Sequence, residues 1–401
     1  MEEQIKKLAE DFAENELKKR WEELDCKNPI LLKDILKKSA NVGIFSFLID
    51  EEIGGSGFNL RDYCIFLEKI SEACAGIGAV FVSHLMGITP ILLLKDTEKR
   101  DRFLSIITES EKEGNPIIFT LAIYEEKFSK LIPDNIQTII KPKNKNYILS
   151  GNKINVLCAE IASYFTLLTK LENSEPIILH KNTKGNENDG IKGFSGDKFV
   201  LLTIPSNSKG IEIKEEKDRM GLKVCPINDI YFHNVEIPQE NILDEDIGLS
   251  DLLNYHKFFD APLGAIAIGM AEEGWNIALK YTTERYQGGK IICEHDAIKM
   301  MLSDMALSIE AAKNFVYPVR KETPPSLSNG VYNSSNIISS AYAVDIAERV
   351  CIDAIQLLGG YGYMKDFKIE QILRDAKTYQ AIINPMSRKM EYINCEVKKI
   401  K

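Results

Sequence analysis

The hydrophobic period of this 401-residue chain changes twice, and this order of elements limits the folds open to it. Up to about residue 116 the apolar residues recur every three or four positions, as on the buried face of a helix, for example over residues 60–73. From about Ile117 short apolar runs, separated by Asn, Gly, Pro and Lys turns, predict strands. After about Asp246 the helical period returns and continues to the end. The chain is therefore predicted to fold as helices, then strands, then helices.

This order predicts an α+β protein of three domains, because 401 residues are too many for one ordinary hydrophobic core. We expect a helical N-terminal domain over residues 1–116, a middle β-barrel domain over residues 117–245 and a C-terminal four-helix bundle over residues 246–401. The helical stretches of the last segment are long enough to pack as an antiparallel bundle. The clearest loop among them is predicted over residues 323–335, which read TPPSLSNGVYNSS.

Composition and charge exclude several classes of protein. The chain is 44% hydrophobic and 27% charged, as in globular domains, and 59 acidic against 50 basic residues leave a net charge of −9. No basic block interrupts this acidity, so nucleic-acid binding is not expected. Residues 1–25 are charged and amphipathic, unlike a signal peptide, and the apolar runs are shorter than the ~18 residues of a membrane span. We expect a soluble, cytoplasmic protein without a membrane span.

Metal chemistry is not indicated by the cysteines. The eight cysteines are scattered, with no C-x-x-C pair and no histidine at metal-ligand spacing. Because no secretory signal is recognised, reduced and buried thiols are expected in preference to disulfides or a zinc site. We predict no bound metal.

Two glycine-rich segments in the C-terminal part carry the strongest local signals. The first reads RYQGGKII from Arg285, where a glycine pair directly after a helical stretch ends the helix and turns the chain. The second reads QLLGGYGY from Gln356, and its glycines let the backbone approach a neighbour or a phosphate. It follows a helical stretch, so it does not fit the strand-linked G-x-G-x-x-G motif. The residues alone favour tight turns between helices, with Arg285 paired to a surface acid.

Together with fragments elsewhere in the chain, these segments resemble the acyl-CoA dehydrogenase family. FLIDEEIGGSGF is similar to that family's L-x-P-E-E-x-G-G-x-G, SGNKINV to its N/S-G-x-K-x-W-I, and DRMGLKV to its M-G-x-R. RYQGGKI is similar to R-x-Q-F-G-K-P, and QLLGGYGY with the later RDAK to Q-x-x-G-G-x-G-Y and R-D-A-K. The resemblance runs the whole chain. It implies the three domains described above, a homo-oligomer (a dimer or, usually, a homotetramer) and one FAD per subunit.

The resemblance also implies cofactor residues. In the family, an arginine reaches the FAD pyrophosphate, usually across a dimer interface, and its guanidinium pairs with phosphate oxygens through charge-assisted hydrogen bonds. The matching positions are Arg285 and Gln287 for the pyrophosphate, His295 and Asp296 for the adenosine part, and Gln356, Gly359 and Gly360 for a backbone contact from the neighbouring subunit. The resemblance to the family therefore favours nucleotide binding, in preference to a simple turn, at Arg285 and at Gly359–Gly360.

The flavin end of the family pattern is altered in this chain. The family's A-L-T-E-P-x-x-G-S-D reads AIYEEKFSKL here, so Tyr124 replaces the threonine that hydrogen-bonds the flavin, and the G-S-D turn is gone. The covering W-I-T strand becomes NVL at residues 155–157, and Gly288 stands where the family has a phenylalanine. The backbone amides of Ile123 and Tyr124 can still hydrogen-bond the flavin.

The catalytic base is the larger departure. The family removes a proton next to a thioester carbonyl while hydride leaves the β carbon, and this needs a buried carboxylate. The two positions at which members carry that glutamate are Ile383 and Phe259 here. Asp260 stands where the family usually has an arginine and is the remaining candidate base, with a solvated or capping aspartate as the alternative. An acid at this position, and the missing G-S-D turn, weaken the match to a CoA site.

Three functions stay open. The first is an FAD-dependent oxidoreductase that dehydrogenates an acyl-CoA or an acyl-carrier-protein thioester and passes electrons to an electron-transfer flavoprotein. The second is a base-free relative, such as a desulfinase-type lyase or a flavin monooxygenase-like enzyme. The third is a non-catalytic subunit that partners an active paralogue. The first is favoured because most members of the family are dehydrogenases, which is an argument from analogy.

Overall fold

The computed structural model describes residues 2–126, 136–172, 199–317 and 337–400. The chain forms two compact units. The helical unit consists of Met1–Val82, Asp218–Cys225 and Phe259–Lys401, and the sheet unit consists of Ser83–Lys217 and Pro226–Phe258. Each unit has its own buried core.

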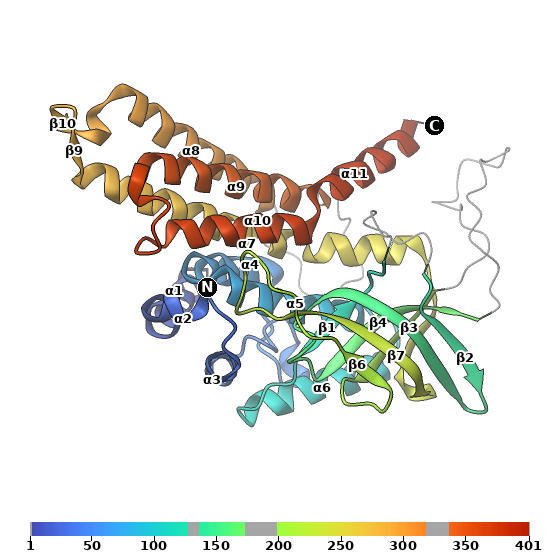
Figure 1. Ribbon diagram of the computed structural model, residues 1–401. Helices are drawn as coiled ribbons and strands as arrows, with labels where there is room; N and C mark the ends of the chain where they lie inside the picture. The colour runs from blue at the N-terminus through green and yellow to red at the C-terminus, as the bar shows by residue number, and fades with distance from the viewer. Residues whose placement is uncertain (1, 127–135, 173–198, 318–336, 401) are drawn as a thin grey trace. The chain divides into compact units, whose positions relative to one another are not determined.

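Helices make up most of the helical unit (Figure 1). Two of them, α5 and α7, run from one unit into the other, and α6 belongs to the sheet unit. The α-helices of the described chain are α1 (Glu2–Phe12), α2 (Trp21–Leu24), α3 (Pro29–Ala40), α4 (Leu60–Ala73), α5 (Ala75–Leu92), α6 (Thr97–Lys112), α7 (Leu249–Glu284), α8 (Asp296–Val316), α9 (Ser339–Leu358), α10 (Ile369–Ile383) and α11 (Pro385–Ile400).

Local caps determine where two of the N-terminal helices begin. The Asn28 side chain accepts a hydrogen bond from the Leu31 amide at 3.1 Å, and Pro29 occupies the first turn of α3, where its missing N–H costs nothing. At the start of α4, the Asn59 side chain accepts from the Asp62 amide at 2.9 Å. Both helix starts therefore follow from local side-chain chemistry.

Aromatic side chains and long helices form the core of the helical unit. Phe47, Phe66 and Phe81 are buried, and their ring centres lie 6.0 Å apart for Phe47–Phe66 and 6.2 Å apart for Phe66–Phe81, within the range of favourable aromatic pairs. In the C-terminal part, α8, α9 and α10 lie side by side with the later part of α7, as Figure 1 shows. A hydrogen bond of 2.9 Å from Tyr379 Oη to the Leu263 carbonyl oxygen joins α10 to α7.

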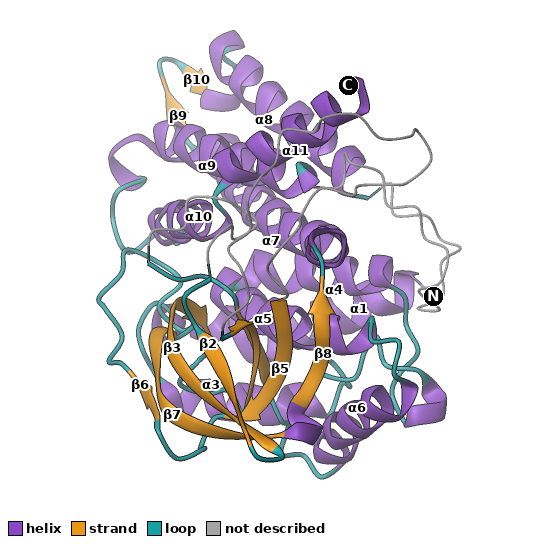
Figure 2. Cartoon of the chain, turned by 90° about the vertical axis from the view of Figure 1, so that its right-hand side faces the viewer, coloured by secondary structure: helices purple, strands orange, loops and turns teal. Residues whose placement is uncertain are grey.

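An eight-stranded mixed sheet forms the core of the sheet unit (Figure 2). Its strand order is β6-β7-β3-β2-β4-β5-β8, and β1 pairs with β4. The β1–β4 and β2–β4 pairs are parallel, and the other pairs are antiparallel. The strands are β1 (Phe119–Ala122), β2 (Ile139–Lys143), β3 (Asn146–Leu157), β4 (Tyr164–Leu171), β5 (Phe199–Pro205), β6 (Ile211–Ile213), β7 (Ile227–Pro238) and β8 (Ile242–Ile247); a separate hairpin joins β9 (Tyr286–Gln287) to β10 (Lys290–Ile291).

The longest ladder of the sheet, β3 with β7, is irregular at two points. The register shifts between Leu149 and Gly151 and again between Lys153 and Val156. Such bulges bend a strand and change the direction of its side chains. The second shift falls in the segment of β3 that resembles the family's flavin-covering strand.

The predicted order of elements is confirmed. The helices before the sheet end with α6 at Lys112, the sheet lies between Phe119 and Ile247, and α7 begins at Leu249. The exact boundaries near residues 116 and 246 stay a prediction, since the two compact units combine segments from distant parts of the chain. The predicted loop over residues 323–335 lies outside the described residues.

Within the described ranges, α5 is the one helix long and apolar enough to cross a membrane. Its 18 residues have a mean hydropathy of 1.7, and 94% of this window is buried inside the protein. A helix that is apolar on all sides needs surroundings that are also apolar. The burial of α5 provides them, as expected for a core helix.

Candidate functional site

An open pocket of about 980 Å³ in the helical unit gathers most of the predicted cofactor residues. Its walls come from the end of α7, the β9–β10 hairpin, the start of α8 and the connection from α9 to α10. The predicted residues that line it are Arg285, Gln287, His295, Gln356, Gly359 and Gly360. The two glycine-rich segments are far apart in the sequence, and the fold brings them into one site.

Arg285 offers its guanidinium to this pocket. The side chain is exposed and forms no ion pair with any residue that the structure describes. Its guanidinium carbon lies 5.9 Å from the centre of the Tyr361 ring, close enough for cation–π attraction. The surface acid expected from the residues alone is therefore not found among the described side chains. An exposed guanidinium in a pocket wall is well suited to pair with phosphate oxygens.

Gly359 and Gly360 leave the main chain bare on the pocket side. A β carbon built on either residue would meet no heavy atom within 4 Å. Gly359 also has a φ of +58°, a conformation that favours glycine. Gly362 differs, because a β carbon there would lie 2.5 Å from the Ile355 carbonyl oxygen. The space beside Gly359–Gly360 therefore fits the close approach of a ligand to the main chain.

The β9–β10 hairpin carries Gln287 into the pocket wall. Gly288 and Gly289 form its two-residue turn with φ values of +66° and +87°, and positive φ at both positions is typical of the turns that hairpins prefer. His295 Nε2 lies 3.0 Å from the Gln287 carbonyl oxygen and ties the hairpin to the start of α8. Glycine at position 288 is thus explained by the turn itself.

Three aromatic residues that the sequence analysis did not name also line the pocket. The ring centre of Tyr361 lies 6.1 Å from that of Tyr281 and 5.3 Å from that of Phe367. Tyr361 belongs to the QLLGGYGY segment, so a signal for it was available, whereas Tyr281 and Phe367 lie outside the glycine motifs. Asp296 is not in the wall: its side chain is 95% exposed and pairs with a lysine one turn along α8. Its contact with adenosine stays a prediction.

Ile123 and Tyr124, the predicted flavin contacts, lie in the sheet unit directly after β1. The Ile123 carbonyl oxygen accepts a hydrogen bond from Lys153 Nζ at 3.1 Å. The Tyr124 carbonyl oxygen accepts one from the Ile154 amide at 2.9 Å. The main chain at this point is thus tied to β3, and a role for it in holding flavin stays a prediction.

Asp260, the candidate base, is fully buried and its carboxylate is fully occupied. Oδ1 accepts hydrogen bonds from Ser340 Oγ and Arg388 Nη1, both at 2.5 Å, and Oδ2 accepts from Ser339 Oγ at 2.5 Å and from the Ser340 amide at 3.0 Å. A carboxylate has about four acceptor positions, and four donors fill them here. Burial raises the pKa of Asp260, and Arg388 and the serines oppose that rise. This geometry favours the capping alternative, because Asp260 caps the start of α9.

Arg388 connects the two positions at which the family carries its glutamate. Its Nε donates to the Ile383 carbonyl oxygen at 3.2 Å, while Nη1 donates to Asp260, the neighbour of Phe259 in α7. Ile383 and Phe259 are both buried and apolar. The guanidinium balances the charge of Asp260, so the acid at this position does not by itself weaken the match to a CoA site.

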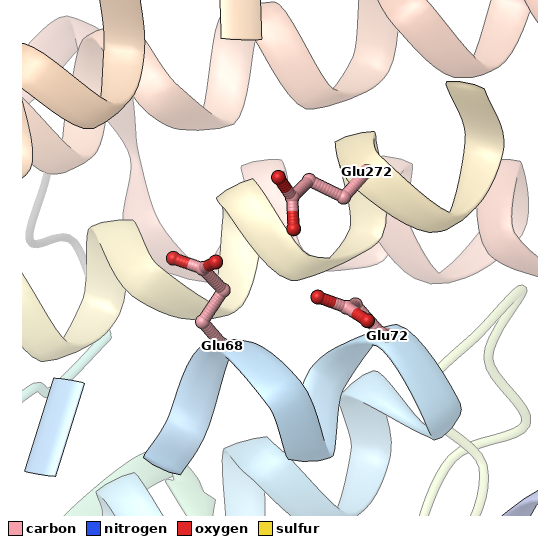
Figure 3. A group of neighbouring side chains, drawn as sticks. All are labelled: Glu68, Glu72 and Glu272. Atoms are coloured by element: carbon pink, nitrogen blue, oxygen red, sulfur yellow. The ribbon is translucent and has the colours of Figure 1, made fainter. Parts of the chain in front are cut away.

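A second, partly buried polar group joins α4 to α7. Glu68 and Glu72 of α4 point toward Glu272 of α7 (Figure 3), and each offers an oxygen within 4.8 Å of the others. Such a set can hold a cation, but two ammonium groups already lie among these carboxylates. Lys69 Nζ is 3.3 Å from Glu272, and Lys313 Nζ is 3.4 Å from Glu68. We interpret the group as an internal ion-pair network, and burial raises the pKa of Glu72 in it to about 8.

Comparison with protein families identifies the chain. The N-terminal domain of acyl-CoA dehydrogenases matches residues 1–111, and the C-terminal domain of acyl-CoA dehydrogenases matches residues 261–382, together more than half of the chain. This protein belongs to the acyl-CoA dehydrogenase family. The family, the fold class and the class of enzyme predicted from the sequence are therefore confirmed. Because the family consists of flavoproteins, a flavin cofactor is implied.

Relatives of this acyl-CoA dehydrogenase-type protein cover nearly its whole length. The 3-(aryl)acrylate reductase of Clostridium sporogenes is 29% identical over 385 residues, 93% of this chain and 92% of that protein. The caffeyl-CoA reductase-Etf complex subunit CarC of Acetobacterium woodii is 29% identical over 94% of this chain and 92% of its own length. Butyryl-CoA dehydrogenase from Megasphaera elsdenii, a solved structure, has a TM-score of 0.84 at 23% identity, over 99% of this chain and 98% of that one. The last likeness shows a shared fold.

Proposed function

We propose that this protein is an FAD-dependent oxidoreductase acting at the α,β carbon–carbon bond of an acyl thioester, carried by CoA or by an acyl carrier protein. The observation that carries the proposal is the pocket that gathers Arg285, Gln287 and Gly359–Gly360 in a chain of this family. A guanidinium fork is a donor suited to a diphosphate, and glycines without a side chain let the main chain come close to it. Family membership supplies the class of reaction.

In this proposal the pocket residues bind the nucleotide part of FAD and take no part in bond-making. Arg285 pairs with pyrophosphate oxygens, Gly360 allows the main chain to approach, and Tyr361 offers an aromatic face. Main-chain groups at Ile123 and Tyr124 hold the flavin ring. The bound flavin supplies the group that accepts or donates a hydride.

The substrate class is proposed from the names of the relatives. Two reductases at 29% identity are named for 3-(aryl)acrylate and for caffeyl-CoA. Both names describe a carbonyl compound with a conjugated α,β double bond. Reduction of that bond and its formation by dehydrogenation are opposite directions of one reaction, so we propose an α,β-unsaturated acyl compound as the oxidised form of the substrate.

The absorbance spectrum of the purified protein tests the cofactor. We expect flavin bands after incubation with FAD, and we expect Arg285→Met to weaken FAD binding by about ten-fold or more, the effect of losing a hydrogen bond to a charged group. Arg349→Met is the matched control, because Arg349 is an exposed arginine of α9 that donates to Ser308 and does not line the pocket. A protein that stays colourless with FAD would contradict the proposal and favour a non-catalytic subunit.

Anaerobic mixing tests the substrate. Acyl-CoA thioesters should bleach the oxidised flavin, and α,β-unsaturated thioesters, including aryl-substituted ones, should restore the colour of the chemically reduced flavin. The same measurements with these acyl groups attached to an acyl carrier protein show which of the two carriers, CoA or the carrier protein, the enzyme accepts. No change in colour with any thioester would overturn the proposed reaction while leaving the cofactor proposal intact.

A base-free reaction is the second candidate, and the geometry of Asp260 favours it. All acceptor positions of the Asp260 carboxylate are filled by protein donors, and Ile383 and Phe259 take no protons. A desulfinase-type lyase or a monooxygenase-like enzyme does not need to remove an α proton. Release of sulfite from a sulfinate thioester, without bleaching by acyl-CoA, would support this candidate.

Partners and location complete the proposal. An electron-transfer flavoprotein is the proposed redox partner, since one relative is named as a subunit of a reductase–Etf complex. A dimer or tetramer and a cytoplasmic location are proposed from the resemblance to the family. Reduction of an electron-transfer flavoprotein by substrate, dependent on this protein, would test the partner.

A further inference from the structure

A lysine lies fully buried in the sheet unit. Lys153 is on β3 and has 0% of its surface exposed. Its Nζ donates to Glu125 Oε1 at 2.7 Å and to the Ile123 carbonyl oxygen at 3.1 Å. Glu125 is also buried, at 3% exposure. The ammonium group thus links β3 to the main chain that follows β1.

Glu125 extends this link to a third segment. Its Oε2 accepts a hydrogen bond from the Gln137 amide at 2.7 Å, and its Oε1 accepts one from the Thr138 amide at 3.0 Å. The Thr138 hydroxyl donates to the Asn152 carbonyl oxygen at 2.9 Å, next to Lys153 on β3. Residues 123–125, 137–138 and 152–153 are therefore tied together around one ion pair.

Stability alone gives little reason to bury this pair. Removing a lysine and a glutamate from water is expensive, and well-packed apolar side chains of similar volume often serve equally well or better. The cost is visible in the lysine, because burial lowers the pKa of Lys153 to about 8 even though Glu125 opposes the shift. A pair kept at this cost calls for a role beyond packing.

The pair also survives where its surroundings in the family pattern have changed. Glu125 stands at the E of A-L-T-E-P, whose threonine and proline are Tyr124 and Glu126 here. Lys153 stands at the K of N/S-G-x-K-x-W-I, whose tryptophan is Asn155. The side chains expected to touch flavin differ from the family pattern, whereas the two residues of the ion pair match it.

We propose that Lys153 and Glu125 are positioning residues that hold the main chain at Ile123 and Tyr124 in the conformation that binds the flavin ring. The inference rests on the proposed function, because Ile123 and Tyr124 are flavin contacts only within it. With the threonine hydroxyl gone, main-chain groups carry the recognition of the ring. Main-chain groups recognise a ligand only where the backbone is rigid, and Lys153 holds a carbonyl oxygen of this segment directly.

The test compares Lys153→Met with a double variant, Lys153→Met with Glu125→Gln. In the single variant Glu125 loses its charged partner, so we expect a lower melting temperature, amide exchange over residues 119–126 about ten-fold faster, and FAD affinity about ten-fold weaker. In the double variant no unpaired charge remains, and we expect the melting temperature to recover. FAD affinity should stay about ten-fold weaker, because the Ile123 carbonyl oxygen still lacks its donor.

The matched control is Lys214→Met in the same unit. Lys214 pairs with Glu212 on β6, but both side chains are 47% exposed, so neither the exchange over residues 119–126 nor FAD affinity should change. A purely structural role for Lys153 predicts that FAD affinity returns together with stability in the double variant, and that result would overturn the proposal. Unchanged amide exchange in the single variant would overturn it as well.

The same experiment separates this inference from the proposed function. A parent protein that binds no FAD contradicts both the proposed function and the inference about flavin. Amide exchange still reports in that case whether Lys153 orders residues 119–126. A parent protein that binds FAD, with variants that bind it equally well, leaves the proposed function standing and overturns the inference alone.

Discussion

The ion pair of Asp260 with Arg388 joins residues 128 positions apart in the sequence. It connects α7 to α11, and the serines at the start of α9 complete the group. Both side chains are almost fully buried, at 0% and 3% exposure. Loss of one partner therefore leaves an uncompensated charge in the interior, which is far more costly than loss of a surface pair.

We predict that Asp260→Asn lowers the free energy of unfolding by about 3 kcal/mol, measured by denaturant titration. Asp345→Asn is the control, because Asp345 of α9 pairs with Lys389 of α11, the neighbour of Arg388, at 36% and 50% exposure. This surface pair should contribute less than about 1 kcal/mol. If Asp260 acts as a cap, the folded, FAD-loaded Asp260→Asn variant keeps its reaction with acyl-CoA. Loss of bleaching in the folded variant would instead identify Asp260 as the base.

The Glu68–Glu72–Glu272 network predicts a pH dependence of stability. Burial and a hydrogen bond to Glu272 raise the pKa of Glu72 from 4.5 to about 8. Between these two pH values the folded protein keeps a proton on Glu72 that the unfolded chain releases. The contribution of Glu72 to the free energy of unfolding is therefore complete below pH 4.5 and is lost as the pH rises through 8. Asp375, with a pKa raised by burial to about 7, acts in the same direction.

We expect Glu72→Gln to weaken this dependence. In the parent protein Glu72 lowers the free energy of unfolding by at most about 1.4 kcal/mol per pH unit between pH 5 and pH 8, and the glutamine variant lacks that contribution. Urea unfolding at several pH values gives the comparison. Parallel pH curves for the two proteins would contradict a raised pKa at Glu72.

At the scale of single elements, the connection from α9 to α10 contains one glycine that packing requires and another that borders the pocket. Gly362 is needed by the fold, because a β carbon there would lie 2.5 Å from the Ile355 carbonyl oxygen. Gly360 has open space around its β position and no left-handed φ. Its bare main chain therefore belongs to the pocket, since the fold itself accepts a side chain at this position.

We predict that Gly360→Ala leaves the melting temperature unchanged and weakens FAD binding by about ten-fold, measured by flavin fluorescence. Gly274→Ala in α7 is the control, because its β carbon would make only ordinary contacts of 3.5 Å or more and it does not line the pocket. Gly362→Ala should instead lower the melting temperature. Unaltered FAD affinity in Gly360→Ala would argue against this wall of the pocket as the diphosphate site.

At the scale of the whole molecule, exposed apolar side chains on α11 support the predicted homo-oligomer. Met386, Met390, Ile393 and Val397 are 42% to 66% exposed. Their spacing of four, three and four residues puts them on one face of the helix. A continuous apolar stripe of this kind is typical of a surface that contacts another protein.

We predict that Ile393→Glu reduces the molar mass measured by light scattering. A buried carboxylate without a partner is costly, so the oligomer should dissociate into smaller species. Ile30→Glu is the matched control, because Ile30 is 85% exposed near the start of α3, and it should leave the mass unchanged. An unaltered mass for Ile393→Glu would exclude this face of α11 from the contact.

Much of the fold was predictable because it depends on local patterns. The buried face of α4 follows from the helical spacing of its apolar residues, and Asn59 caps its start. The alternation of apolar residues and turns predicted the strands between Phe119 and Ile247. The motifs also led to the family and to six of the residues that line the pocket, but aromatic side chains outside those motifs, such as Tyr281 and Phe367, were missed.

The order of helices and strands and the family could be read from the amino-acid sequence, because hydrophobic period, caps and motifs act over neighbouring residues. The tertiary structure alone decided which distant side chains meet. It brought Arg285 and Gly359–Gly360 into one pocket, surrounded Asp260 with four donors and buried Lys153 against Glu125. The chemistry of an acid or a base depends on burial and on partners far along the chain, and no local pattern encodes these.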